Sequence, residues 1–295
     1  MSELLVYRIA IIGVGLIGGS LALALKRVAA VGEVVGCART RATLDKALEM
    51  GVIDRAESDV ARAVSGADLV LVATPIGVMS EIFGAMVPAL GPKAIVSDAG
   101  SVKGSVMAAA RKAFGERNAR FIPGHPIAGK ECSGVEAAHA DLFAGQQVIL
   151  TPDSDTDACA LKTVRRGWEI AGARVSEMDA ARHDELLAGI SHLPHALAFA
   201  LVNAVAGGAD RETLLKLAAG GFYDTTRIAS SDPTMWRDIF LANGERVLAA
   251  LDGFGHEIAE LRTLIKNADA NGLYEFCARA RDARNAGLRR RNGDG

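Results

Sequence analysis

The fold of this chain is decided by the stretch Arg8-Ile9-Ala10-Ile11-Ile12-Gly13-Val14-Gly15-Leu16-Ile17-Gly18-Gly19-Ser20. Its first five residues are mostly apolar and rich in β-branched side chains, which predicts a short buried strand. The glycines that follow predict a tight turn, and residues 21–26 have the composition of a helix. The stretch therefore predicts a strand, a turn and a helix in direct succession.

This order of elements gives the glycines a chemical meaning. Gly13 permits the turn, Gly15 lets the backbone approach a pyrophosphate, and Gly18 lets the helix pack closely on the strand. The unpaired N–H groups at the start of the helix, at Leu16 and Ile17, would face the anion. We therefore predict a dinucleotide site, with a purely structural glycine turn as the alternative.

The end of the second predicted strand indicates which dinucleotide is bound. NAD enzymes commonly carry an acidic residue there, but residues 34–37 lead into Ala38-Arg39-Thr40-Arg41. Arg39 can grip phosphate oxygens and Thr40 can add a hydroxyl, whereas a carboxylate would repel a 2′-phosphate. This favours NADP, with NAD still possible. The alternative is that these arginines are ordinary solvated side chains.

Strands and helices alternate through the first half, with further strands expected at residues 67–73, 94–98, 120–123 and 147–150. The fold class is thus α/β, a doubly wound, mostly parallel Rossmann-type sheet. Ligands in such sheets lie beyond the carboxyl ends of the strands. We expect three loops to converge there: Thr74-Pro75, with Thr74 near the cofactor, Gly100-Ser101-Val102-Lys103 and Gly124-His125-Pro126.

Beyond residue 178 the periodicity is helical only. We predict a dinucleotide-binding domain at 1–177, an all-helical substrate and dimerisation domain at 178–284, and a flexible tail at 285–295. Residues 190–205 are so apolar that this helix must be covered by the first domain or by a second subunit.

His125 is the candidate proton acceptor. Hydride transfer from a carbinol carbon requires a group that takes the hydroxyl proton near neutral pH, and imidazole suits that task. Gly124 and Pro126 restrict the backbone on either side of the ring. The alternative is a loop histidine that satisfies a neighbouring carbonyl group.

Composition bounds the remaining possibilities. The chain has 295 residues, is 50% hydrophobic and carries a formal net charge of −2, which argues against nucleic-acid binding. We find no apolar run that predicts a membrane span and no signal sequence, so a cytoplasmic protein is expected. The four cysteines are scattered, and we expect plain thiols. We expect no metal, because His192 and His195 have no carboxylate or cysteine partner nearby in sequence.

Several motifs together resemble one family, the prephenate and arogenate dehydrogenases of tyrosine biosynthesis. They are Gly13-Val14-Gly15-Leu16-Ile17-Gly18-Gly19-Ser20, Asp98-Ala99-Gly100-Ser101-Val102-Lys103, Gly124-His125-Pro126-Ile127-Ala128-Gly129, Ser191-His192-Leu193-Pro194-His195, Gly220-Gly221-Phe222, Thr226-Arg227-Ile228-Ala229 and Ser231-Asp232-Pro233-Thr234-Met235-Trp236. The resemblance implies a nucleotide-binding domain followed by a helical domain that forms a homodimer. It also implies an oxidative decarboxylation, in which hydride leaves the ring carbon bearing the hydroxyl, carbon dioxide departs and the ring becomes aromatic.

The resemblance also implies roles for individual residues. His125 would be the catalytic histidine, and Ser101 would bind the same hydroxyl and orient the imidazole. Arg227 would clamp a substrate carboxylate and His195 would donate a hydrogen bond to the substrate. Glu131 and Asp224 match acidic positions near the pocket. His192 is expected to be structural, and His139, His183 and His256, which have no such support, are expected at the surface.

The sequence leaves two questions open. It does not decide between the ketone side chain of prephenate and the amine of arogenate. Two other classes also share the glycine pattern: a two-domain NAD(P)-dependent oxidoreductase of β-hydroxy or imino acids, and a catalytically silent dinucleotide sensor. Neither requires both the His125 motif and the Arg227 motif.

Overall fold

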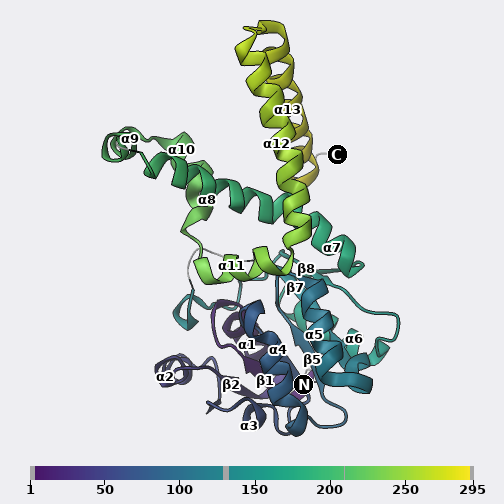
Figure 1. The fold of residues 1–295 in the computed structure, drawn as a ribbon. Coiled ribbons are helices and arrows are strands. Elements are labelled where there is room, and N and C mark those ends of the chain that lie inside the picture. Colours follow the sequence, from purple (N-terminus) through teal and green to yellow (C-terminus); the bar gives the residue numbers. More distant parts are fainter. Residues whose placement is uncertain (1–3, 129–132, 209, 293–295) are drawn as a thin grey trace. The chain divides into compact units, whose positions relative to one another are not determined.

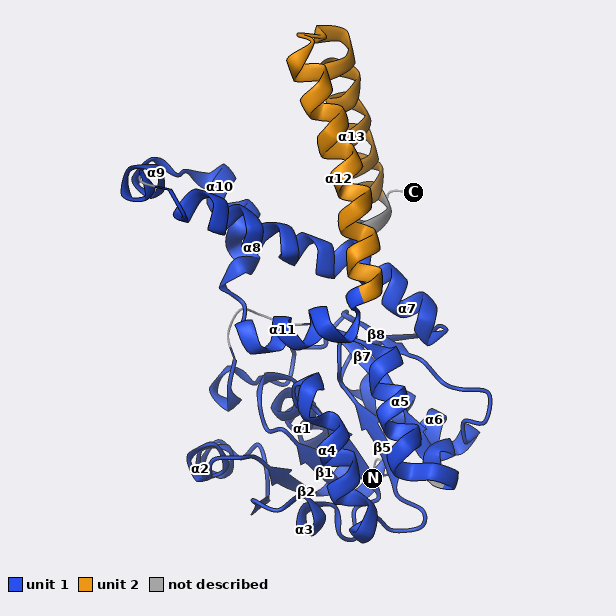
Figure 2. Ribbon diagram, in the orientation of Figure 1, with its two compact units in different colours: residues 1–244 blue, residues 245–295 orange. Residues whose placement is uncertain are grey.

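The structure is a computed structural model that describes residues 4–128, 133–208 and 210–292. It divides into two compact units, residues 1–244 and residues 245–295 (Figure 2). The border between these units lies well beyond the predicted domain border at 177/178. The reason is that helices after residue 178 are hydrogen-bonded to the sheet domain, for example through Asp184 to the N–H of Lys103 and Asp238 to the N–H of Gly77. The functional division at 177/178 stays a prediction.

The first unit is built on a parallel sheet of six strands in the order β3-β2-β1-β4-β5-β6. Figure 1 labels β1, β2 and β5 of this sheet. The strands are β1 (Val6–Ile12), β2 (Val31–Cys37), β3 (Arg55–Glu57), β4 (Leu69–Val72), β5 (Ile95–Asp98) and β6 (Phe121–Ile122). In the centre, Ile9 of β1 lies beside Val34 of β2 and Leu69 of β4. The predicted doubly wound parallel sheet is therefore confirmed, with the short β3 in addition.

Alternate side chains of β1 enter two separate cores. Ile9 and Ile11 pack with residues of α1 and α6, whereas Ala10 and Ile12 pack with residues of α3, α4 and α5. These helices are α1 (Leu16–Arg27), α3 (Val60–Val64), α4 (Ile76–Met86), α5 (Lys103–Phe114) and α6 (Ala158–Ile170), and α2 (Arg41–Glu49) follows β2. Burial on both faces explains why the strands read as continuous apolar runs.

A second, smaller sheet carries the predicted base. It consists of β7 (Gly124–Ile127), β8 (Gln147–Leu150) and β9 (Arg174–Glu177), with β7 and β8 antiparallel and β8 and β9 parallel. The prediction of a loop at Gly124-His125-Pro126 was therefore wrong, and 147–150 pairs here rather than in the main sheet. A proline is tolerated in β7 because an edge strand leaves some N–H groups outside the ladder.

One long helical segment follows the sheets. It comprises α7 (Ala180–Leu187), a π-helical turn (Ala188–His192) and α8 (Leu193–Ala206). The π-turn precedes Pro194 and accommodates its missing N–H, so the helix continues. Contrary to the prediction from sequence, residues 180–206 are long and apolar enough to cross a membrane by length and composition, although this test is also passed by core helices of soluble proteins. Only Ala198 of α8 is buried in the chain.

Short helices complete the first unit. They are α9 (Arg211–Leu217), α10 (Gly220–Thr226), a 3-10 turn (Arg227–Ser230) and α11 (Pro233–Ala242). The second unit consists of α12 (Gly244–Lys266, whose first residue belongs to the first unit) and α13 (Ala270–Asn292), and Arg279 of α13 pairs with Glu257 and Glu260 of α12. The helix α13 continues to Asn292 and so includes eight residues of the segment 285–295, which the sequence predicts to be a flexible tail.

Candidate active site

The glycine turn between β1 and α1 has the geometry that the sequence predicts. Gly13 has a φ of +99°, and a Cβ placed there would lie 2.5 Å from the Ala73 carbonyl oxygen. A Cβ at Gly18 would lie 2.4 Å from the Gly13 carbonyl oxygen. Both positions therefore require glycine. A Cβ at Gly15, by contrast, would meet nothing within 4 Å, so the space above this residue is open.

This open space suits the phosphates of a dinucleotide. The side chains of Leu16 and Ile17 pack against the core, which leaves their backbone N–H groups as the donors at the helix start. No acidic residue stands in the first turn of α1 to repel an anion. The hydroxyl of Thr74, whose methyl group would lie 3.0 Å from a Cβ at Gly13, is buried without a partner among the described residues. The residues present thus fit the predicted cofactor.

The side chains proposed to select NADP, those of Arg39, Thr40 and Arg41, differ in the hydrogen bonds that they make within the chain. Thr40 caps α2, because its hydroxyl accepts a hydrogen bond from the Thr43 N–H at 3.3 Å. Arg41 pairs with Asp45 one turn later, at 2.8 Å. Arg39 is exposed and lies directly after Ala38, at the end of β2. Of the three, Arg39 is thus the side chain best placed to meet a 2′-phosphate.

His125 is buried at the start of β7, with 9% of its surface exposed. Burial lowers the pKa of its imidazole well below the usual value, and the nearby His183, Lys103 and His192 lower the pKa further. The ring is therefore neutral at physiological pH. A neutral imidazole is the form that can accept a proton.

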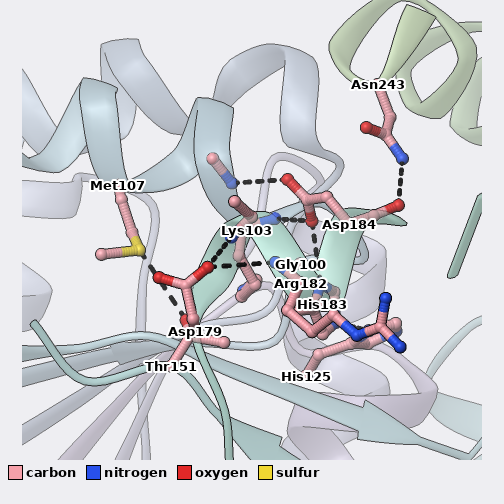
Figure 3. Close-up of polar contacts among 12 residues, drawn as sticks. Gly100, Lys103, Met107, His125, Thr151, Asp179, Arg182, His183, Asp184 and Asn243 are labelled. Atoms are coloured by element: carbon pink, nitrogen blue, oxygen red, sulfur yellow. Dashed lines mark hydrogen bonds and ion pairs between the residues drawn. The ribbon is translucent and has the colours of Figure 1, made fainter. Parts of the chain in front are cut away.

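His125 shares a hydrogen bond with His183, which orients the His125 ring. The two atoms His125 Nδ1 and His183 Nε2 lie 2.9 Å apart, and His183 Nδ1 lies 2.8 Å from Asp184 Oδ1 (Figure 3). The prediction that His183 is a surface residue was wrong, because its side chain is fully buried. The helix α7 packs against α5, and a helical period alone did not reveal that contact. His256 is exposed as predicted, and His139 is half-buried.

A buried ion pair holds the backbone next to His125. Lys103 and Asp98 are both fully buried and bonded to each other. Lys103 Nζ also donates to the Gly124 carbonyl oxygen at 2.6 Å, and Asp98 Oδ1 accepts from the Gly124 N–H at 3.1 Å. This pair was not predicted from the sequence, although Asp98 ends a predicted strand and Lys103 starts the next helix. The position of both residues at the carboxyl end of the same strand was the feature of the sequence that could have indicated this pair.

A second cluster surrounds Trp236 of α11. His195 stacks on its ring at 3.7 Å, and the His192 ring lies 6.0 Å away, edge to face. His195 Nδ1 donates to the Ser191 carbonyl oxygen, so Nε2 of the neutral ring is an acceptor rather than the donor that the resemblance implies. His192 is buried, and burial lowers its pKa to about 4. Within the described residues His192 Nε2 and Trp236 Nε1 have no partner.

The remaining predicted site residues lie on separate elements. Ser101 is half-buried just before α5, Asp224 is exposed in α10, and Arg227 is exposed where α10 ends. Glu131 lies outside the described residues. These predicted roles stay predictions.

Comparison with known families covers nearly the whole chain. Residues 21–177 match the family model for the nucleotide-binding domain of prephenate dehydrogenase, and residues 179–279 match the model for its dimerization domain. The chain belongs to the prephenate dehydrogenase family. It is therefore an NAD(P)-dependent dehydrogenase, and the resemblance stated from the sequence is confirmed.

Relatives of this family agree in sequence and in structure. The chain is 39% identical to a cyclohexadienyl dehydrogenase of Zymomonas mobilis over 94% of each chain. It is 36% identical to a prephenate dehydrogenase of Bacillus subtilis, over 92% of this chain and 74% of that one. The structure of prephenate dehydrogenase from Aquifex aeolicus with hydroxyphenyl propionate and NAD+ aligns with a TM-score of 0.88, at 39% identity over 94% of this chain and 97% of that one. A Synechocystis arogenate dehydrogenase aligns with a TM-score of 0.79, at 31% identity over 95% and 99%.

Proposed function

We propose that this chain catalyses the oxidative decarboxylation of prephenate and that His125 is the group that takes the hydroxyl proton. The observation that carries this proposal is the buried, neutral imidazole held by Lys103 and Asp98 through Gly124. It lies where β6 has just ended, at the same end of the sheet as the glycine turn after β1. A base and a dinucleotide site at one edge of the sheet are what hydride transfer from an alcohol requires.

The chemistry assigns a defined task to the ring. When bound, the nicotinamide dinucleotide accepts hydride from the ring carbon that bears the hydroxyl. His125 accepts the hydroxyl proton as that carbon becomes a carbonyl. The bond to the ring carboxylate breaks, its electron pair completes the aromatic ring, and carbon dioxide leaves. His125 then returns its proton to the phenolic oxygen, so the reaction releases no net proton.

Substrate recognition rests on the carboxylates of prephenate. Arg227 is proposed to clamp one carboxylate, since a guanidinium offers two parallel donors and a permanent charge. Trp236 Nε1 and His192 Nε2, which have no hydrogen-bond partner among the described residues, support binding of an anionic group beside them. Ser101 is proposed to bind the hydroxyl and His195 to contact the substrate. Glu131 and Asp224 are proposed to bind near Arg227 or to receive the amino group of arogenate.

The preferred cofactor is proposed to be NADP. The support is the absence of an acid at Ala38 and the exposed Arg39 beside it. The Aquifex aeolicus relative was solved with NAD+, so use of both cofactors is expected, with kcat/KM higher for NADP. The variant Ala38→Asp with Arg39→Ile should reverse the order, because the new carboxylate repels a 2′-phosphate and can bind the ribose hydroxyl. A preference for NAD in the unchanged protein would refute this choice.

The protein is further proposed to be a cytoplasmic homodimer. The dimerization-domain match covers α8, and this apolar helix buries only Ala198 within the chain, which supports cover by a second copy. The buried His183 and Asp184 at the start of the same helical segment fit a protein core better than a lipid environment. Sedimentation equilibrium of the purified protein without detergent tests this, and a monomer would refute it.

The activity itself is tested by following cofactor reduction with prephenate and arogenate side by side. We expect reduced cofactor and 4-hydroxyphenylpyruvate in equal amounts from prephenate. A matched reaction with arogenate, which would give tyrosine, measures the preference between the two substrates. Absence of reduction with both substrates would refute the proposed function.

A further inference from the structure

We propose that His183 and Asp184 are positioning residues that fix the tautomer of His125 and take up the positive charge that forms there during turnover. This inference rests on the proposed function, in which His125 accepts a proton from the substrate. Its basis is the chain of hydrogen bonds from Asp184 through His183 to His125, all within the fully or nearly buried interior (Figure 3).

The first step is the orientation of Asp184. Its two carboxylate oxygens accept the backbone N–H groups of Lys103 and Gly104, each at 2.8 Å. Burial raises the pKa of this carboxyl, but hydrogen bonds from His183, Lys103 and Gly104 outweigh burial and hold the pKa below its usual value. Asp184 is therefore ionised and can only accept hydrogen bonds.

The ionised Asp184 fixes the tautomers of His183 and His125. Because Asp184 Oδ1 cannot donate, the proton in its bond with His183 stays on His183 Nδ1. In the neutral ring His183 Nε2 then carries the lone pair and accepts from His125 Nδ1. His125 Nδ1 consequently bears a hydrogen, and the lone pair of His125 is at Nε2. A single carboxylate thus selects the form of His125 that can act as a base.

The hydrogen bond between His125 and His183 also lets the positive charge of a protonated His125 move to His183. When His125 Nε2 takes the substrate proton, the N–H bond at His125 Nδ1 breaks and a new N–H bond forms at His183 Nε2. The positive charge moves from His125 to His183, beside the Asp184 carboxylate. The surrounding groups favour this move, because the Lys103 ammonium disfavours a positive charge on His125, whereas His183 is hydrogen-bonded to the Asp184 carboxylate. The Asp98 carboxylate nearby is already bonded to Lys103. The reverse transfer restores the neutral pair.

A spectroscopic test does not depend on turnover. The chain has six histidines, so selective 15N labelling and comparison with His125→Asn assigns the nitrogen signals of His125. We expect Nδ1 of His125 to be protonated and Nε2 to be unprotonated in the wild-type protein at neutral pH. In Asp184→Asn the amide can donate to His183, which reverses both tautomers. A wild-type His125 protonated at Nε2 would overturn the proposal whether or not the enzyme turns over prephenate.

Kinetics separate positioning from packing. His183→Phe keeps the bulk but removes the acceptor, and we expect kcat to fall about 100- to 1000-fold with KM within about 3-fold. His183→Gln can still accept from His125 Nδ1 but takes no proton, so its kcat should lie between those of His183→Phe and wild type. His256→Gln, on α12, is the control and should leave kcat unchanged. Wild-type kcat in a folded His183→Phe would overturn the proposal, since a neutral spacer would then suffice.

Discussion

The buried pair of Asp98 and Lys103 allows a quantitative prediction for Asp98→Ala. The change leaves the Lys103 ammonium fully buried without its counterion and removes the acceptor of the Gly100 N–H at 2.7 Å and of the Gly124 N–H at 3.1 Å. Removing one partner of a buried pair costs about 3–5 kcal/mol of unfolding free energy. At about 2–4 °C per kcal/mol for a unit of this size, the unfolding midpoint should fall by roughly 6–20 °C.

Two further variants and a pH series identify the cause. Lys103→Met combined with Asp98→Ala removes the unpaired charge, so the double variant should be more stable than Asp98→Ala alone. Burial lowers the pKa of Lys103 although Asp98 raises it, so without Asp98 the folded-state pKa falls further. At pH values between the lowered folded-state pKa and the ordinary lysine pKa, Lys103 is protonated in the unfolded state but not in the folded state. Loss of Asp98 widens this pH range. Stability of Asp98→Ala should therefore rise between pH 7 and 9.

The assay is urea unfolding followed by circular dichroism, with the wild type at each pH as the reference. A loss below about 1 kcal/mol, or a double variant less stable than Asp98→Ala, would refute the assignment of a charged, paired lysine.

Three further predictions concern the cofactor turn, the base and the clamp. Gly18→Ala should destabilise the protein by about 1–3 kcal/mol, because its Cβ would overlap the Gly13 carbonyl oxygen. Gly15→Ala should keep thermal stability but weaken cofactor binding about 10-fold or more, as measured by a fluorescence titration. Unchanged cofactor affinity in Gly15→Ala would place the phosphates elsewhere. The acid limb of the kcat/KM profile should lie below the usual imidazole pKa of 6.5, because the neutral form of His125 is favoured down to lower pH, and a limb above 6.5 would contradict this. Arg227→Ala should raise KM roughly 30- to 900-fold, or about 2–4 kcal/mol, and an unchanged KM in steady-state assays would remove the clamp from the site.

Patterns of neighbouring residues in the sequence were sufficient to predict individual strands, turns and helices of the fold. The strand at residues 8–12, the glycine turn and the following helix depend on neighbours in sequence, and all three form as expected. Pro126 was predicted to lie in a loop beyond the carboxyl end of a strand, but it lies in the edge strand β7. Its place in an edge strand depends on the partner β8, more than twenty residues away, which no local pattern reveals.

In the candidate active site, too, local motifs were predicted but contacts between distant residues were not. His125 was identifiable from its motif, but its partner His183 is 58 residues away and is buried only because α7 packs on α5. A histidine in a polar helical turn reads as exposed until that contact is known. The role of Lys103 was hidden for a similar reason, since lysine is seldom fully buried and its burial here depends on Asp98.

A comparison of wild type with His125→Asn tests whether His125 takes the hydroxyl proton during oxidative decarboxylation of prephenate. The initial rate of cofactor reduction with saturating prephenate is measured for wild type and His125→Asn, with cofactor affinity determined on the same samples. We predict a wild-type reaction and a loss of kcat of about 100- to 10,000-fold in His125→Asn, with cofactor affinity unchanged. Turnover of His125→Asn close to the wild-type rate would show that His125 does not take the hydroxyl proton.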